Sequence, residues 1–280
     1  MESQYPAVLP GSVLPPASTG AAFGHHAVRV ASVLAWPALF LVLLVAAWAF
    51  MAHRLDTPLV PGAGEVGLEL VRVIGDGEFL RQMGITIQRV LLGFALAFAA
   101  ALAAGIAMGR SRAFDRFMEP AILIGLTVPG LVWALLCVIW FGISLLTSTV
   151  AVALSIAPAL VLNVAQGVKA VNADLVEMSA VFQLSFWARL RFLWLPTLAP
   201  FLLSAIRLGL SLAWKVIVLV EVFGMSSGVG YQLNSEFSSQ NVAGVLAWTI
   251  GFAGVMALIE YGLIGALERH ASRWRRVATL

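Results

Sequence analysis

Long stretches without charge dominate this sequence and decide what it can fold into. The longest runs from residue 120 to residue 168 without a single Asp, Glu, Lys or Arg. A helix needs roughly 20 apolar residues to cross about 30 Å of hydrocarbon, so this stretch is too long for one crossing. The chain is 61% hydrophobic and 11% charged, with a mean hydropathy of +0.95, which exceeds the apolar content of a soluble domain. We therefore expect an all-α membrane protein.

About six segments meet the length requirement for a membrane-spanning helix. A tight turn at residues 142–144 divides the longest uncharged stretch into two of them. The expected spans are residues 30–52, 90–108, 120–141, 145–167, 197–220 and 242–267. Residues 1–27 contain many Pro, Gly and Ser residues, which predicts a disordered cytoplasmic tail before a transmembrane domain over residues 28–280.

The Lys and Arg residues outside the spans predict the orientation, because retained positive charge marks the cytoplasmic side. With both termini inside, the opposite side holds only Arg54, Arg72, Arg81 and Arg89. The basic residues then lie at the membrane edge, where they face anionic lipid headgroups of the bilayer. The net charge of +3 therefore requires no nucleic-acid partner.

The polar segment 172–196 interrupts the uncharged stretches, and its charged and apolar residues alternate at helical spacing. Asp174 with Glu177 three residues later resembles a capping box, in which Asp174 caps a first helix. Ser185 then caps a second helix, and Pro196 suits the first turn of the next span. We expect a cytoplasmic helical hairpin on which a partner docks. The alternative is an amphipathic interfacial helix without a partner.

Ionisable residues within the spans are costly, by about 2.5 to 3.5 kcal/mol each at the bilayer centre, and are expected to face protein or water. On the fifth span, Arg207, Trp214 and Glu221 recur every seven residues and form a stripe, with Lys215 about 100 degrees away. Two cations on one span favour an anionic solute, which predicts that these residues line a translocation pathway. The alternative is structural pairing of Arg207 or Lys215 with Glu221, Glu260 or backbone carbonyl groups.

Prolines interrupt the third and fourth spans. Pro129-Gly130 and Pro158 are expected to kink these helices and to free carbonyl groups that line a cavity. These positions are candidates for gating, although helix packing accounts for them equally well.

Nothing in the sequence indicates chemistry carried out by this chain. Its four histidines have no carboxylate or thiol partners at metal-ligand spacing. No G-x-x-x-x-G-K-S/T phosphate loop occurs, so any ATP that drives the protein binds to another subunit. We expect no catalytic residue, no metal and no cofactor in this chain.

Several short motifs occur together in one order along the chain. They are Trp140-Phe141-Gly142-Ile143, Glu177-Met178-Ser179, Gln183, Leu195-Pro196, Arg207-Leu208-Gly209, Ala213-Trp214-Lys215 and Glu221. Together they resemble the membrane-spanning permease subunits of bacterial ABC importers, with the nitrate, sulfonate and taurine type most similar. The resemblance covers residue 58 onward. In the cytoplasmic motif, E-A-A, three residues, G and a later L-P, Gln183 replaces the glycine and Met178-Ser179 replaces the small pair.

The resemblance implies a type I importer permease fold in the bacterial inner membrane, with both termini cytoplasmic. It implies a homodimer, two ABC ATPase subunits that bind ATP and Mg²⁺, and an external binding protein that delivers a small anion such as nitrate, a sulfonate or taurine. The ATPases would contact the hairpin at Asp174, Glu177, Ala180, Gln183, Leu195 and Pro196. Residues 226–231 resemble the outer segment that re-enters toward the pathway.

Two other functions remain open from the residues themselves. An ion-coupled secondary transporter would use Glu221 or Glu260 as a proton carrier, paired with Arg207 or Lys215. A membrane-anchored scaffold would give the intramembrane charges and the hairpin no shared purpose.

Overall fold

The computed structural model describes residues 21–55, 57 and 59–264, and all regular secondary structure in that part of the chain is helical. The chain divides into two units, Met1–Ala63 and Gly64–Leu280. Most of the expected tail, residues 1–20, lies outside the described residues. Helix α1 (Ala21–Leu55) begins within the last part of that tail and includes the expected first span. It forms the first unit, in which Trp48 Nε1 donates to the carbonyl of Pro61 at 3.1 Å.

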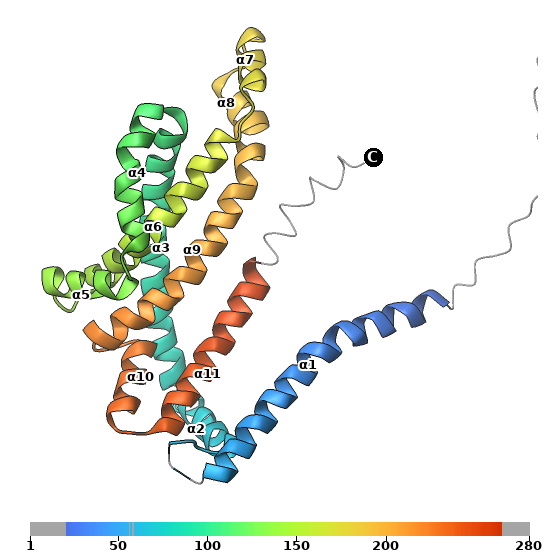
Figure 1. Ribbon diagram of the computed structural model, residues 1–280, viewed down its shortest axis with the longest axis vertical. Helices are drawn as coiled ribbons and strands as arrows, with labels where there is room; N and C mark the ends of the chain where they lie inside the picture. The colour runs from blue at the N-terminus through green and yellow to red at the C-terminus, as the bar shows by residue number, and fades with distance from the viewer. Residues whose placement is uncertain (1–20, 56, 58, 265–280) are drawn as a thin grey trace, which may run out of the picture. The chain divides into compact units, whose positions relative to one another are not determined.

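The second unit is a bundle of helices of very different lengths (Figure 1). Its long helices α3, α6 and α9 carry the core, α7 and α8 lie at one end, and α10 lies at the other. The elements are α2 (Ala63–Gly75), α3 (Glu78–Arg110), α4 (Arg112–Thr127), α5 (Gly130–Phe141), α6 (Leu145–Lys169), α7 (Ala173–Val181), α8 (Phe186–Arg189), the π-helix η1 (Leu190–Trp194), α9 (Leu195–Gly224), α10 (Val229–Ser238), α11 (Val242–Leu258) and the π-helix η2 (Ile259–Ile264).

Helices α3 and α6 pack closely because glycines of α3 face valines of α6. A Cβ atom added at Gly93 would lie 2.6 Å from Cβ of Val152, and one added at Gly105 would lie 2.7 Å from Cβ of Val164. Both contacts have the same offset in sequence, so the two helices run parallel. Small residues at such positions allow the close approach on which membrane helix packing depends.

Because α3 and α6 run parallel, the chain between them must return across the bundle. It does so as α4 and α5, which are bent by 97° at the break around Pro129. The expected kink at Pro129-Gly130 is therefore present, whereas the expected start of this span at residue 120 is wrong, since α4 already begins at Arg112. Pro129 is the N-cap residue of α5, where a backbone amide would have no hydrogen-bond acceptor within the helix, so proline costs no helical hydrogen bond there. Pro158 lies inside α6 and packs against Gly125 of α4.

Four helical segments of the described chain are long and apolar enough to cross a membrane, and the bent pair α4–α5 makes a fifth. The expected turn after Phe141 is confirmed, with Gly142 at φ 64° and Ser144 as the N-cap of α6. The expected sixth span corresponds to α11, which has 17 residues and continues into η2, while residues 265–267 lie outside the described chain.

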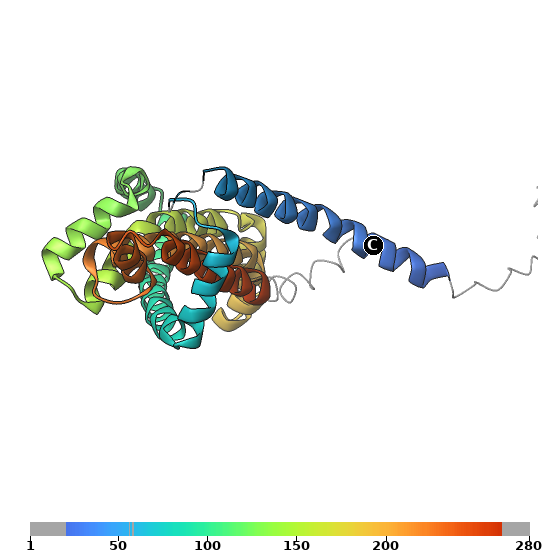
Figure 2. The same cartoon turned by 90° about the horizontal axis from the view of Figure 1, so that it is seen from below.

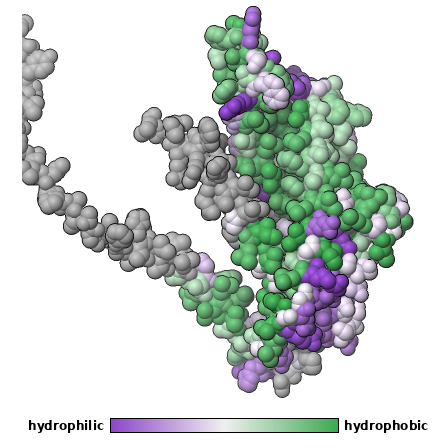
Figure 3. All heavy atoms as spheres, turned by 180° about the vertical axis from the view of Figure 1, so that it is seen from behind, coloured by the Kyte–Doolittle hydropathy of each residue, from purple (hydrophilic) through white to green (hydrophobic). Residues whose placement is uncertain are grey.

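The surface of the second unit follows this arrangement. On the face shown in Figure 3, hydrophobic side chains cover the middle of the bundle and hydrophilic side chains gather toward its ends. Seen from below (Figure 2), α10 and α11 lie in front of the longer helices. At this end a small second core joins α2, α3, α10 and α11 through Val73, Phe79, Val229 and Trp248. A hydrophobic band between more hydrophilic ends is the surface expected of a protein that crosses a bilayer.

Candidate functional site

The hairpin over residues 172–196 begins with a cap that differs from the expected one. Asn172 is the N-cap of α7, and its Oδ1 accepts from the amide of Asp174 at 2.8 Å. The expected capping box of Asp174 and Glu177 is therefore wrong, because Asp174 lies in the first turn as the capped residue. Asn and Asp have similar N-cap preferences, so residue type alone did not separate the two positions.

The turn after α7 requires a left-handed residue, and Gln183 occupies that position with φ 50°. The amide of Gln183 donates to the carbonyl of Ala180 at 3.0 Å, and the amide of Leu184 donates to the carbonyl of Ser179 at 3.0 Å. This pair of bonds is a Schellman motif, which usually places glycine at the left-handed position. The glutamine thus adopts the conformation that the motif glycine would take, at a conformational cost of about 1 kcal/mol.

The second arm of the hairpin is continuous with the fifth span. Ser185 caps α8 as expected, with its Oγ accepting from the amide of Ala188 at 3.2 Å. From Phe186 the helix then runs to Gly224 without a break, through η1 and α9. Leu195 and Pro196 therefore lie inside one rod, directly after the wider π turn in which the amide of Leu195 reaches the carbonyl of Leu190. The expected separation of a second hairpin helix from the span is wrong.

One face of α7 exposes apolar side chains at the hydrophilic end of the bundle. Leu175, Met178, Val181 and Phe182 follow helical spacing, and the last two are 79% and 69% exposed. Ser179, one helical turn after Leu175, is buried. An exposed apolar stripe on a short helix is the pattern with which a helix binds in a groove of another protein.

The four expected pathway residues of α9 do not share one surface. Trp214 is buried and packs edge-on against Phe252, and Glu221 is fully buried. Arg207 and Lys215 are exposed. Arg207 Nε lies 3.8 Å from Oε1 of Glu260 in η2, so the structural alternative of a pair between these two side chains is present. Two of the four residues, Trp214 and Glu221, therefore face the core of the bundle, and the other two face its surface.

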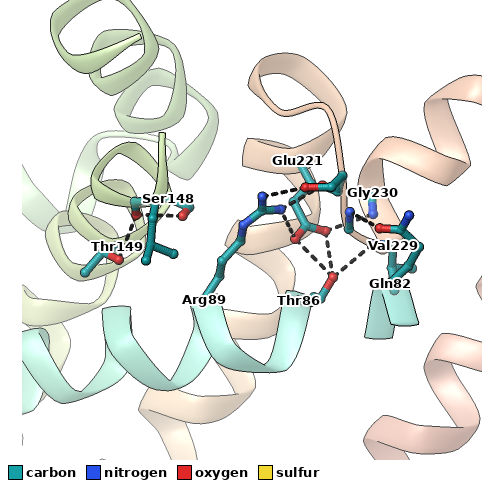
Figure 4. Close-up of polar contacts among 11 residues, drawn as sticks. Gln82, Thr86, Arg89, Ser148, Thr149, Glu221, Val229 and Gly230 are labelled. Carbon is teal, nitrogen blue, oxygen red and sulfur yellow. Dashed lines mark hydrogen bonds and ion pairs between the residues drawn. The ribbon is translucent and has the colours of Figure 1, made fainter. Parts of the chain in front are cut away.

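Glu221 lies at the centre of a buried polar cluster, shown in Figure 4. Its Oε1 accepts from Nη1 of Arg89 at 2.8 Å. Thr86 Oγ1 donates to both carboxylate oxygens, at 3.0 and 2.9 Å, and the amide of Gly230 donates to Oε2 at 3.0 Å. A buried carboxylate with a cation and two further donors has the partners that a charge in an apolar core requires.

The same cluster holds the loop between α9 and α10. Three successive amides donate to side chains of other elements: Gly228 to Gln82 Oε1 at 2.6 Å, Val229 to Thr86 Oγ1 at 2.9 Å, and Gly230 to Glu221. Arg89 also donates to the carbonyl and the hydroxyl of Ser227, at 2.7 and 2.8 Å. Helix α10 is therefore capped by side chains of α3 and α9 rather than by its own first residue, and the three helices are joined.

Sequence reasoning missed the α3 side of this cluster. Arg89 was expected to lie outside the membrane, just before a span that began at residue 90, but it is buried within α3. The helix starts at Glu78, and Gln82, Thr86 and Arg89 lie on one face of it at i, i+4 and i+7. That spacing was the available signal. The expected start of a helix at Glu78 is confirmed, and only the placement of Arg89 outside the membrane-spanning part of that helix is wrong.

Comparison with known proteins identifies the family to which this chain belongs. The family described as binding-protein-dependent transport system inner membrane component matches residues 82–273. SsuC of Escherichia coli (strain K12), named for the transport of aliphatic sulfonates, is 31% identical over 228 residues, which cover 80% of this chain and 82% of SsuC. TauC, the taurine transport system permease protein of the same organism, is 29% identical over 241 residues, which cover 83% of this chain and 86% of TauC.

A solved structure supports the fold. The inward-facing MetNI methionine ABC transporter matches with a TM-score of 0.62 at 16% sequence identity, covering 70% of this chain and 97% of that chain. The expected all-helical importer-permease fold is thus confirmed, as is a multi-pass protein of the inner membrane. Because the family match extends over more than half of the sequence, the chain belongs to the inner-membrane components of binding-protein-dependent transport systems, the permease subunits of ABC importers.

Proposed function

We propose that this permease imports a small oxoanion, such as a sulfonate, taurine or nitrate, as a homodimer that two ATPase subunits drive. The ATPases bind ATP and Mg²⁺, and an external binding protein delivers the solute. The names of SsuC and TauC support a sulfonate-bearing solute. The two cations on the exposed side of α9 favour an anion in general, since both offer charge-assisted hydrogen bonds.

The observation that carries this proposal is the exposed apolar stripe of α7 at the end of a rod that continues into α9. An ATPase groove that binds Met178, Val181 and Phe182 would remove apolar surface from water. Asp174, Glu177, Ala180 and Gln183 are also exposed around this stripe and would supply its polar rim, with exposed Leu195 and Pro196 at the base of the hairpin.

Closure of the ATPase dimer would then move α9 directly. The second arm of the hairpin and the fifth span form one helix from Phe186 to Gly224, and the buried cluster around Glu221 joins the far end of that helix to α3 and α10. A displacement at α7 would therefore reach the opposite end of the bundle through a continuous element. The break at Pro129-Gly130 gives α5 its own direction and is the proposed gating hinge, whereas Pro158 holds α4 against α6.

The charges at the two ends support a cytoplasmic hairpin. Most basic residues in the described part of the second unit lie near the hairpin end: Arg110, Arg112, Arg116, Lys169, Arg189 and Arg191. The α10 end has fewer basic residues, among them Arg72 and Arg81, which pair with Glu69 at 2.6 Å and with Glu78 at 2.7 Å. The positive-inside rule assigns the more basic end to the cytoplasm. The α10 end then faces the binding protein.

Co-purification of the permease with its ATPase tests the docking surface. Val181→Asp and Glu177→Lys should each reduce the bound ATPase at least about tenfold, because a new charge on the apolar stripe or a reversed charge beside it opposes the contact. Phe237→Asp is the matched control, since Phe237 on α10 is 73% exposed at the opposite end and should leave ATPase binding intact.

Uptake by vesicles tests the energy source. Vesicles that hold permease, ATPase and binding protein should accumulate solute only when ATP is hydrolysed. Accumulation driven by a proton gradient in vesicles with the permease alone would contradict the proposal and support ion-coupled transport. Retention of the ATPase by all hairpin variants would contradict the docking surface alone.

A further inference from the structure

A polar ridge runs along the exposed side of α9 between its two cations. Arg207, Ser211 and Lys215 are spaced four residues apart, so each lies about 6 Å further along the helix and about 40° around it from the one before. Ser204 is exposed on the same side, one turn earlier. Lys215 lies about 14 Å from the helix end at Gly224, and the other helix end is further still. A stretch of roughly 20 residues crosses the hydrocarbon, and counted back from Gly224 it includes Lys215, Ser211 and Arg207, so we infer that the ridge lies at membrane depth.

Two members of the ridge have no partner within the described chain. Neither the hydroxyl of Ser211 nor the ammonium of Lys215 makes a hydrogen bond or ion pair with any residue that the structure describes. Hydroxyls of α6 behave differently. Thr149 Oγ1 donates to the carbonyl of Leu145 at 2.9 Å, and Ser155 Oγ donates to the carbonyl of Ala151 at 2.8 Å. The ridge thus offers donors that no described residue of the chain accepts.

Unused donors at membrane depth need an acceptor from elsewhere. An ammonium in hydrocarbon is unfavourable, so this side of α9 must face water, a solute or a partner chain rather than lipid. Arg207 has Glu260 nearby, whereas Lys215 has no carboxylate among the described residues that would neutralise it. The ligand that satisfies such a site is an anion with several acceptor oxygens.

We propose that Lys215 and Ser211 bind the oxoanion group of the solute during its passage, as a specificity-determining site. This inference rests on the proposed function and refines it to two side chains. The ammonium supplies the charge, and the hydroxyl supplies a directed hydrogen bond one helical turn away. A solute with a sulfonate or nitrate group fits because all its oxygens are acceptors, and a neutral solute of the same size does not.

Cysteine labelling tests whether the ridge faces water. In permease–ATPase complexes in lipid, Ser211→Cys should react with a charged, membrane-impermeant thiol reagent, and ethanesulfonate should slow the reaction. The wild type is the background control, because its single cysteine, Cys137, is buried. Reaction with lipid-soluble reagents alone would overturn the proposal, because the ridge would then face lipid. This measurement does not depend on transport activity.

Uptake measurements with taurine, ethanesulfonate and nitrate test the chemistry. For whichever probe the wild type imports, Lys215→Met should reduce uptake at least about tenfold and Ser211→Ala several-fold, as expected for loss of a charge-assisted and a neutral hydrogen bond. Lys215→Arg should restore most uptake, and Ser155→Ala should leave it unchanged. Wild-type uptake by Lys215→Met would overturn the site. Failure of the wild type to couple ATP hydrolysis to any uptake would instead contradict the proposed function.

Discussion

Arg89 of α3 and Glu221 of α9 form a buried ion pair, with Nη1 of Arg89 2.8 Å from Oε1 of Glu221. The two residues are far apart in sequence, and their pair joins two of the long helices near the α10 end. Neither side chain is accessible enough to be stabilised by water, since Glu221 is fully buried and Arg89 is 8% exposed. Such a pair persists only with further hydrogen bonds, and here Thr86, Ser227 and Gly230 provide them.

Removal of one partner of this pair should destabilise the permease strongly. Arg89→Met or Glu221→Met alone would leave a buried charge without its counterion, which costs about 3 to 5 kcal/mol. The double variant removes both charges and should be destabilised by about 2 kcal/mol less than the sum of the two single variants. Unfolding of the purified permease in mixed micelles, followed as a double-mutant cycle, measures this difference. Simple additivity would show that the pair is not coupled.

The loop after α9 should tolerate no side chain at Gly228. This residue has φ 101° and ψ 170°, a region that only glycine adopts readily, and a Cβ atom there would overlap the carboxylate of Glu221. Gly228→Ala is expected to lower the free energy of unfolding by at least about 2 kcal/mol. Gly254→Ala is the control, because Gly254 lies in α11 with no atom within 4 Å of the added Cβ. It should leave stability unchanged or slightly raised. Equal effects would contradict the described loop.

The helical fold could be predicted from the sequence because hydropathy reports how long each apolar segment is. The expected ends of the spans agreed best with the observed helix ends where a turn residue follows the helix. Gly142 is the example, since α5 ends just before it and α6 begins at Leu145. The proline at residue 129 indicated that the helix would kink there, but the size of the bend could not be obtained from the sequence. An uncharged segment has the same hydropathy whether it is straight or bent, and the 97° angle depends on how α4 and α5 pack against α6.

The site was less predictable than the fold, for a related reason. Polar residues near a span end are ordinarily assigned to water, so Arg89 was placed outside the membrane. Its burial depends on Glu221, a partner that only the folded chain brings within reach. Glu221 itself was a candidate pathway residue from the sequence, but periodicity placed it on a stripe with Arg207. The structure shows instead that one side of α9 faces the core and another side, with Lys215, faces outward.

Asn172 and Asp174 at the start of α7 should contribute differently to helix stability, because only Asn172 caps the helix. Asn172→Ala removes the side chain that accepts from the amide of Asp174 and should destabilise the first turn by about 1 kcal/mol, or about fivefold in local opening. Asp174→Ala removes only a favourable charge near the helix start, worth a few tenths of a kcal/mol at an exposed site. Hydrogen exchange of the first amides of α7 measures both. A larger effect at Asp174 would restore the capping box that the structure excludes.

Gln183 and Gln240 both have a left-handed backbone conformation and can be compared with each other. Gln183 at φ 50° ends the turn after α7, and Gln240 at φ 58° holds the equivalent position after α10, with amides paired in the same way. Glycine adopts this conformation without the steric cost that a Cβ atom carries, so Gln183→Gly and Gln240→Gly should each stabilise the local turn by up to about 1 kcal/mol.

Hydrogen exchange at the amides of Leu184 and Asn241 measures the two turns separately, because each of these amides closes one of the motifs, at 3.0 and 2.9 Å. Exchange at Leu184 should slow about fivefold in Gln183→Gly and remain unchanged in Gln240→Gly, and the reverse should hold at Asn241. Gln183→Val supplies the opposite change, since a β-branched residue is unfavourable at positive φ and should accelerate exchange at Leu184. Faster exchange in Gln183→Gly would show that the turn does not rely on the left-handed conformation, and that the hairpin closes in another way.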